Sequence, residues 1–265
     1  MSDLILSTEQ IDNFKEMENN CEDFFEFIDL GQEICSAGDK DWASDIFKKA
    51  EKIIGNFDDC MDLFKAVVDD DYLGNKEWGQ KLISKAIQFA ETSANTSLLL
   101  IEIGGVVHNN YYLGDYQKAK DIFKQGVKHA KNEDLFERSI CYPLMDLADD
   151  IVIPKDDNGY GNKVWGKEIY DLALEKARLE AHSETCPFIS ADTFFPLRDF
   201  GLWVAKKDGL NDEKLSIKIL LESIEIAEND DYANIDEDIY QVVEDLLGDK
   251  FCNLLKKAKL NQQTD

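Results

Sequence analysis

The chain has 265 residues, of which 29 are Lys or Arg and 55 are Asp or Glu, so its formal net charge at pH 7 is −26. Phosphate groups and anionic lipid headgroups are bound by a surplus of Lys and Arg, so this charge argues against nucleic acid and membrane surfaces as direct partners. Hydrophobic residues make up 44% of the chain, which is enough apolar surface to exclude a disordered polymer.

Neither the cysteines nor the N-terminal residues indicate an exported or membrane-bound protein. The six cysteines form no CxxC pair, and most stand in apolar helical patterns, where a thiol behaves as a small buried hydrophobe. The first residues lack a basic segment followed by an apolar run, and no stretch approaches the ~18 apolar residues of a transmembrane helix. We therefore expect a cytoplasmic protein with reduced thiols.

Taken in chain order, apolar stripes at helical spacing alternate with short turn signals. Residues 8–19 predict a leading helix that caps the chain. Longer stripes predict the first helices of successive pairs, over residues 24–37, 60–73, 98–113 and 136–151. Each stripe is followed by a glycine that precedes Asp or Asn, at Gly38, Gly74, Gly114 and Gly161. Because glycine suits a helix C-terminus and an Asp or Asn oxygen caps the next helix, each step predicts a tight turn.

The helices after these turns share a pattern of small, large and small residues. The large residue follows the first small one by four positions and the second small one follows three later, so all three lie on one helix face. Small residues let a neighbouring helix approach closely, and the large residue fills the space between them. The triplets are Ala43/Phe47/Ala50, Gly79/Ile83/Ala86, Ala119/Phe123/Gly126, Gly166/Tyr170/Ala173 and, more weakly, Ser216/Leu220/Ser223. The remaining stripes predict a fifth pair, 193–205 with 212–229, and end helices over 232–247 and 249–259.

The third repeat resembles the tetratricopeptide-repeat family. It carries Tyr111-Tyr112-Leu113-Gly114-Asp115-Tyr116 and then Ala119, Phe123 and Gly126, where that family has Gly-Asp/Asn-Tyr at the turn and Ala, Phe and Ala on the second helix. The resemblance covers roughly residues 21–229. The chain departs from the family by lacking its closing Pro, by having Trp near other turns and by a period above the usual ~34 residues.

The resemblance implies an all-α fold, namely a right-handed α-solenoid of about five helix-turn-helix units with end helices. We expect a single helical-repeat domain over residues 1–265. Residues 1–20 would form its N-terminal cap, residues 21–229 its repeats and residues 230–265 its C-terminal capping helices. In such a stack the first helices line a concave groove.

Residues that usually carry catalysis or hold metals are scattered along the chain. His108, His129 and His182 fall in different repeats, and the sequence has no zinc or phosphate-binding motif. The Asp-rich loop 155–161 does not fit a calcium loop, because Pro154 and Trp165 would have to be its first and last ligands. We therefore expect no enzyme activity, no catalytic residue, no metal site and no cofactor.

Acidic residues cluster beside aromatic ones where first helices are predicted to end. Asp69-Asp70-Asp71-Tyr72 and His108-Asn109-Asn110-Tyr111-Tyr112 occupy matching places, and Asp149-Asp150 stands near that place in the fourth repeat. A negative field steers a basic partner, and aromatic side chains anchor it. The candidate partner-binding residues are therefore Asp69, Asp70, Asp71, Tyr72, His108, Asn109, Tyr111, Tyr112, Asp149 and Asp150.

The same features also have structural explanations. The acidic clusters suit a solvated surface that keeps the protein in solution, His108 suits a helix cap, and two of the tyrosines suit the core. Three tryptophans follow the repeat period and a fourth lies on a first helix, so we expect them to pack repeats together: Trp42, Trp78, Trp165 and Trp203. Three phenylalanines beside prolines suit either a cover for the stack or an exposed apolar patch: Phe188, Phe194 and Phe195.

Two functions follow from these patterns. The first is a non-enzymatic binding module whose acidic groove captures a basic protein or peptide, as an immunity (antidote) protein or a chaperone would. The alternative is a scaffold or adaptor in a multiprotein assembly, which would use apolar patches while the acidic charge serves only solubility.

Overall fold

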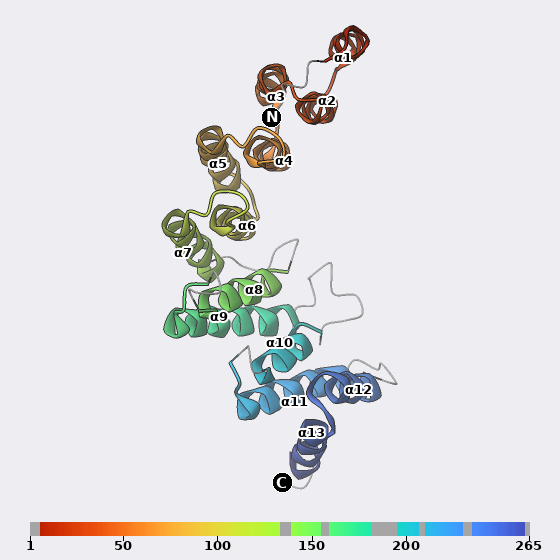
Figure 1. Cartoon of the computed structure of the whole chain (residues 1–265). Coiled ribbons are helices and arrows are strands. Elements are labelled where there is room, and N and C mark those ends of the chain that lie inside the picture. The colour runs from red at the N-terminus through yellow and green to blue at the C-terminus, as the bar shows by residue number, and fades with distance from the viewer. Residues whose placement is uncertain are drawn as a thin grey trace. The chain divides into compact units, whose positions relative to one another are not determined.

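The protein is all-α throughout the residues that the structure describes. The computed structural model describes residues 6–132, 139–154, 159–181, 195–206, 210–229 and 235–262, and the regular elements in these ranges are α-helices (Figure 1). They are α1 (Thr8–Asn20), α2 (Phe24–Ser36), α3 (Lys40–Ile53), α4 (Phe57–Val68), α5 (Lys76–Glu91), α6 (Thr96–His108), α7 (Tyr116–Asn132), α8 (Cys141–Val152), α9 (Lys163–Ala181), α10 (Phe195–Ala205), α11 (Glu213–Asn229), α12 (Ile235–Leu247) and α13 (Asp249–Gln262). The prediction of an all-α fold is confirmed.

The chain divides into two compact parts, a first lobe of residues Met1–Lys128 and a second lobe of residues His129–Asp265. In the first lobe α2 packs against α3 and α4 against α5, and in the second lobe α8 packs against α9, α10 against α11 and α12 against α13. Within each lobe a pair also contacts the next pair, because α3 meets α4, α5 meets α6, α9 meets α10 and α11 meets α12. Stacking in chain order is the arrangement of an α-solenoid, and its right-handed sense stays a prediction.

The turns inside the helix pairs have the predicted caps. Four glycines have φ between 61° and 103°, a region in which a Cβ is strained: Gly38, Gly74, Gly114 and Gly161. The residue after each glycine accepts a hydrogen bond of 2.9–3.1 Å from the backbone N–H three residues later: Asp39, Asn75, Asp115 and Asn162. These bonds satisfy an amide that the first turn of a helix leaves unpaired.

The fifth pair uses the same turn with a different residue. Asn211 has φ of 54° and takes the place of glycine, since Asn tolerates the left-handed region better than most residues. Asp212 then accepts a bond of 3.0 Å from the backbone N–H of Leu215. The weak fifth repeat therefore has the same construction as the others.

The small-large-small triplets form the seams between paired helices. Every triplet residue is buried, including the polar pair Ser216 and Ser223. Glycines on the first helices complete these seams: a Cβ at Gly104 would lie 2.4 Å from the Phe123 ring, and one at Gly201 would lie 2.7 Å from Leu220. The large triplet residue thus occupies space that the facing first helix leaves open, as the triplet pattern predicts.

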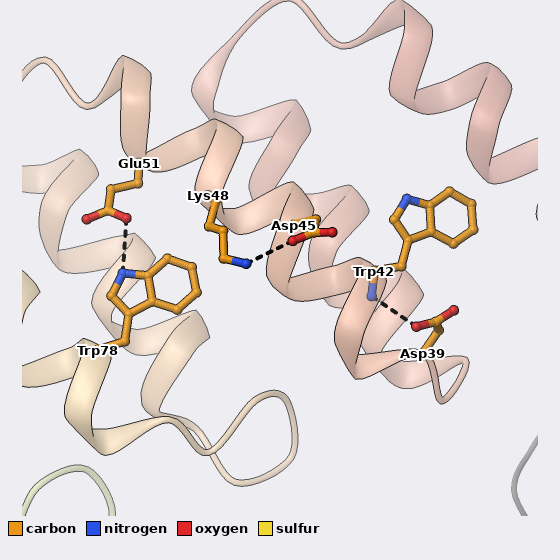
Figure 2. A network of polar contacts seen from close by, with 6 residues as sticks. All are labelled: Asp39, Trp42, Asp45, Lys48, Glu51 and Trp78. Carbon is orange, nitrogen blue, oxygen red and sulfur yellow. Dashed lines mark hydrogen bonds and ion pairs between the residues drawn. The ribbon is translucent and has the colours of Figure 1, made fainter.

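Tryptophans join neighbouring pairs of the first lobe. Trp78 Nε1 donates a hydrogen bond of 3.1 Å to Glu51 on α3 (Figure 2), and Trp42 Nε1 donates one of 3.0 Å to Glu18 on α1. Trp42 and Trp78 each lie in the first turn of the second helix of a pair. The indole of Trp42 contacts the leading helix α1, and that of Trp78 contacts α3, the second helix of the preceding pair. The expectation of packing between repeats is confirmed for Trp78, whereas Trp42 packs the first repeat against the leading helix α1.

Several predicted helix boundaries are wrong. The first helices of the second and third repeats were predicted to end at residues 73 and 113, but α4 ends at Val68 and α6 at His108. Their last predicted residues form the turns, because Asp69 and Asn109 leave helical geometry with ψ of 126° and 124°. The N-cap of α4 is Asn56, so the helix begins at Phe57, three residues before the predicted start at residue 60.

Candidate partner-binding surface

The turn between α4 and α5 is held by the acidic residue that opens it. The Asp69 carbonyl accepts backbone bonds from Tyr72 at 3.0 Å and Gly74 at 2.9 Å. The Asp69 carboxylate accepts the backbone N–H of Asp71 at 2.9 Å, which is an Asx turn. Asp69 therefore shapes the turn, while Asp70 and Asp71 are exposed on it.

The turn between α6 and α7 repeats this geometry with a neutral residue. The Asn109 carbonyl accepts bonds of 3.0 Å from Tyr112 and Gly114, and its side-chain oxygen accepts the backbone N–H of Tyr111 at 2.8 Å. Residues 69–75 and 109–115 are therefore structurally equivalent. Residues 69–72 and 109–112, which open these two turns, are called the turn surface below.

The two turns touch each other through tyrosines. The hydroxyl of Tyr111 is hydrogen-bonded to the Asp69 carboxylate, and this bond with the nearby charges of Asp69 and Asp71 raises the pKa of Tyr111 to about 12. Tyr112 reaches back to α4, where its ring centroid lies 5.7 Å from that of Phe64. The two tyrosine rings also meet edge to face, with centroids 5.2 Å apart.

The turn surface combines negative charge with one accessible aromatic ring. Tyr111 is 52% exposed, Tyr72 and Tyr112 are half-buried, and the rest of the charge lies on Asp70 and Asp71. Residues 69–75 and 109–115 contain four Asp and neither Lys nor Arg. Such a surface attracts cations and offers an aromatic face to them.

His108 lies beneath the turn surface instead of on it. It is buried, and its ring packs edge to face against Tyr116 with centroids 4.7 Å apart and against Phe123 at 6.4 Å. The side chain therefore supports the turn, and the predicted direct contact of His108 with a partner loses its basis.

Asp149 belongs to the second lobe and to a different arrangement. Its carboxylate accepts a hydrogen bond of 2.7 Å from the Tyr170 hydroxyl on α9 and one of 2.5 Å from Trp203 Nε1 on α10. The Tyr170 and Trp203 rings lie against each other with centroids 3.9 Å apart. Burial raises the pKa of Asp149, with the charges of Asp146 and Asp150 adding to the effect.

Asp149 and Asp150 were predicted to stand near the place of Asp69 in the fourth repeat, but they do not occupy the equivalent position. The backbone bond from Asn162 N to Ile151 O, at 2.8 Å, matches the bond from Asn75 N to Val67 O, also 2.8 Å. By this register Asp149 stands four positions before the residue that corresponds to Asp69. Sequence reasoning missed this because the fourth turn is longer, with its helix ending at Val152 and its cap at Asn162.

The described residues were also compared with the requirements of a metal site and of a membrane-spanning helix. In these ranges no group of three or more His, Cys, Asp or Glu is placed to hold a metal ion, and no helix is both long and apolar enough to cross a membrane. The rest of the predictions fall outside the described residues: His182, Phe188, Phe194 and loop residues 155–158.

Comparisons of the chain with protein-family models, with curated proteins and with solved structures found no match. The resemblance to tetratricopeptide repeats therefore stays a prediction, and the interpretation of the turn surface depends on its own geometry.

Proposed function

We propose that the protein is a non-enzymatic binding module whose turn surface captures a basic protein or peptide. The observation that carries this proposal is the contact between the two equivalent turns, which brings the charge of Asp69, Asp70 and Asp71 beside the half-exposed ring of Tyr111. A Lys- or Arg-rich segment is the ligand class that both features favour.

Capture would take place in two steps. The net charge of −26 attracts a basic partner over a distance of about one Debye length, ~10 Å at 0.1 M salt. At the turn surface, a Lys or Arg side chain then lies between the carboxylates of Asp70 and Asp71 and the face of Tyr111. A cation over an aromatic ring contributes ~0.5–1 kcal/mol at an exposed site.

Masking of a basic protein is the role that such a surface would serve. An immunity-type antidote or a chaperone does this by covering positive charge until the partner is released or degraded. A tyrosine hydroxyl is protonated near neutral pH, so the ring of Tyr111 stays neutral beside the carboxylates, and the raised pKa of Tyr111 extends this to higher pH.

The test is the association rate of a labelled Lys/Arg-rich peptide measured by stopped-flow fluorescence. Asp70→Asn with Asp71→Asn leaves the Asx turn of Asp69 intact and removes two charges from the turn surface. We expect the association rate at low salt to fall about tenfold, and Tyr111→Ala to raise the dissociation rate.

The matched control changes two exposed acids of α11, Glu213→Gln with Glu225→Gln, and therefore has the same net charge. A rate that falls equally in both double variants would mean that only net charge matters. A peptide affinity unchanged by all three variants would contradict the proposal and favour the scaffold function.

A further inference from the structure

Charge is distributed unevenly between the two ends of the chain. Residues 16–39 hold eight Asp or Glu and neither Lys nor Arg, whereas α13 holds four Lys and a single Asp. The net charge of α13 is therefore +3 in a chain with net charge −26, and α7, with five Lys and one Asp, is the one described helix that is more positive. The two segments belong to different lobes, and each has a face that its own lobe leaves uncovered.

The uncovered face of α2 is acidic and has an apolar anchor. Phe24, Ile28 and Ile34 are buried against the first lobe. The opposite face holds Phe25, Asp29 and Glu33 at spacings of four residues, and all three are exposed, with Phe25 at 57%. The Phe25 ring lies edge to face against Phe24, with centroids 5.4 Å apart, and an exposed aromatic side chain beside acidic residues can anchor a basic partner.

The uncovered face of α13 has the opposite charge. Its inner face is held in place by buried Phe251 and Leu255, by an ion pair of 2.5 Å between Lys259 and Glu228, and by Lys256 over the ring of Tyr240 at 5.4 Å.

The outer face of α13 holds the rest of its charge. It carries Lys250, Asn253, Lys257 and Leu260 at spacings of three and four residues, all exposed, with Leu260 at 62%. Since Lys256 and Lys259 already contact the second lobe, Lys250 and Lys257 are the lysines that this face can offer to a partner.

We propose that the outer face of α13 in one copy of the protein docks on the outer face of α2 in a second copy. Antiparallel helices would place Phe25 against Leu260 and Asp29 opposite Lys257. Glu33 would then lie within reach of Lys250, since both stripes span about 12–15 Å at 1.5 Å per residue. The partner that fits each face is a second copy of the chain. In the antiparallel arrangement, the apolar residue of α2 meets the apolar residue of α13, and each acidic residue of α2 then meets a lysine of α13 in the same order. This inference is independent of the proposed function.

The two faces have opposite charge, whereas both chains as a whole are strongly negative. The contact therefore has a distinctive salt dependence. At low salt the repulsion between two chains of charge −26 opposes association. Near 0.15 M salt, where the Debye length is ~8 Å, that long-range repulsion is screened while ion pairs in contact persist. At about 1 M salt the pairs are screened as well. Association is therefore strongest at intermediate salt.

Sedimentation equilibrium of the full chain at about 100 μM tests the proposal, since it measures molecular mass directly. At 0.15 M salt we expect wild-type protein to reach at least twice the monomer mass. Asp29→Lys with Glu33→Lys should be monomeric, and so should Lys250→Glu with Lys257→Glu. A mixture of these two double variants should associate again, because each restores the charge that the other has lost.

Matched controls change the same number of charges elsewhere. Glu91→Lys with Glu225→Lys, and Lys214→Glu with Lys218→Glu, alter exposed residues outside both faces and should leave association unchanged. Wild-type protein that is monomeric at every salt concentration would overturn the proposal. So would double variants that remain monomeric when mixed, or controls that abolish association as fully as the test variants.

Discussion

Asp69 in the first lobe and Asp149 in the second lobe show how differently one residue type is used in this protein. Asp69 sits on a surface turn, accepts a backbone amide and leaves its neighbours Asp70 and Asp71 exposed to solvent. Asp149 has both oxygens occupied by Tyr170 and Trp203, and its pKa is raised by burial. An acidic residue is therefore informative about binding only once its burial and its hydrogen-bond partners are known.

The largest effect on stability is expected when the half-buried acceptor Asp149 is removed. Asp149→Ala leaves the Tyr170 hydroxyl and the Trp203 indole N–H without their acceptor. We expect the free energy of unfolding to fall by about 2–3 kcal/mol, measured as a lower urea midpoint. The control is Asp70→Ala on the exposed turn, and an equal loss in that variant would break the comparison.

A second prediction concerns packing that both lobes share. Gly104→Ala and Gly201→Ala would each put a Cβ within 2.4–2.7 Å of Phe123 or Leu220, and overpacking of this kind costs about 2 kcal/mol. Gly105→Ala is the internal control, since its Cβ would meet nothing within 4 Å. It should stabilise the protein by up to ~1 kcal/mol through helix propensity. Thermal melting of the three variants measures both the expected loss of stability and the expected gain.

The pH dependence of stability sharpens the contrast further. Because burial raises the folded-state pKa of Asp149, its contribution to stability is greatest below the unfolded pKa of about 3.9 and declines as the pH rises through the folded pKa. Asp149→Asn stays neutral and lacks this decline. Relative to wild type, the variant should therefore gain unfolding free energy between about pH 4 and pH 7. A constant difference over that range would show that Asp149 titrates normally.

The smallest effect on stability is expected at the turn surface. Asp70→Asn with Asp71→Asn should change the free energy of unfolding by no more than ~0.5 kcal/mol, because both side chains are exposed. Urea unfolding checks this, and it separates a binding defect in the same variant from a folding defect. A loss of more than about 1 kcal/mol would mean that these acids are structural, as Asp149 is.

Local patterns predicted most of the fold. The Gly-Asp and Gly-Asn steps and the triplets depend on neighbours within about seven residues, so periodicity alone located the turns, their caps and the seams. Helix ends were less predictable: residues 69–73 and 109–113 are compatible with a helix, and only the backbone bonds of Asp69 and Asn109 show that they form turns.

The candidate site was predicted only in part, for the same reason. The turn surface contains Asp69, Asp70, Asp71 and Tyr111 as expected, whereas His108 is buried and Asp149 lies in the second lobe. The longer fourth turn shifts the register between repeats, and no local signal in the sequence marks how many residues it adds.

By itself the sequence determined the helical class, the positions of the paired helices and the excess of negative charge, because these follow from composition and short-range spacing. Tertiary structure decided which acids remain in solvent, since burial depends on residues far along the chain. Trp203 donates a hydrogen bond to Asp149, which lies 54 positions earlier in the chain. Tyr111 of the third repeat is hydrogen-bonded to Asp69 of the second repeat. These long-range contacts assign one carboxylate to the interior and another to the surface.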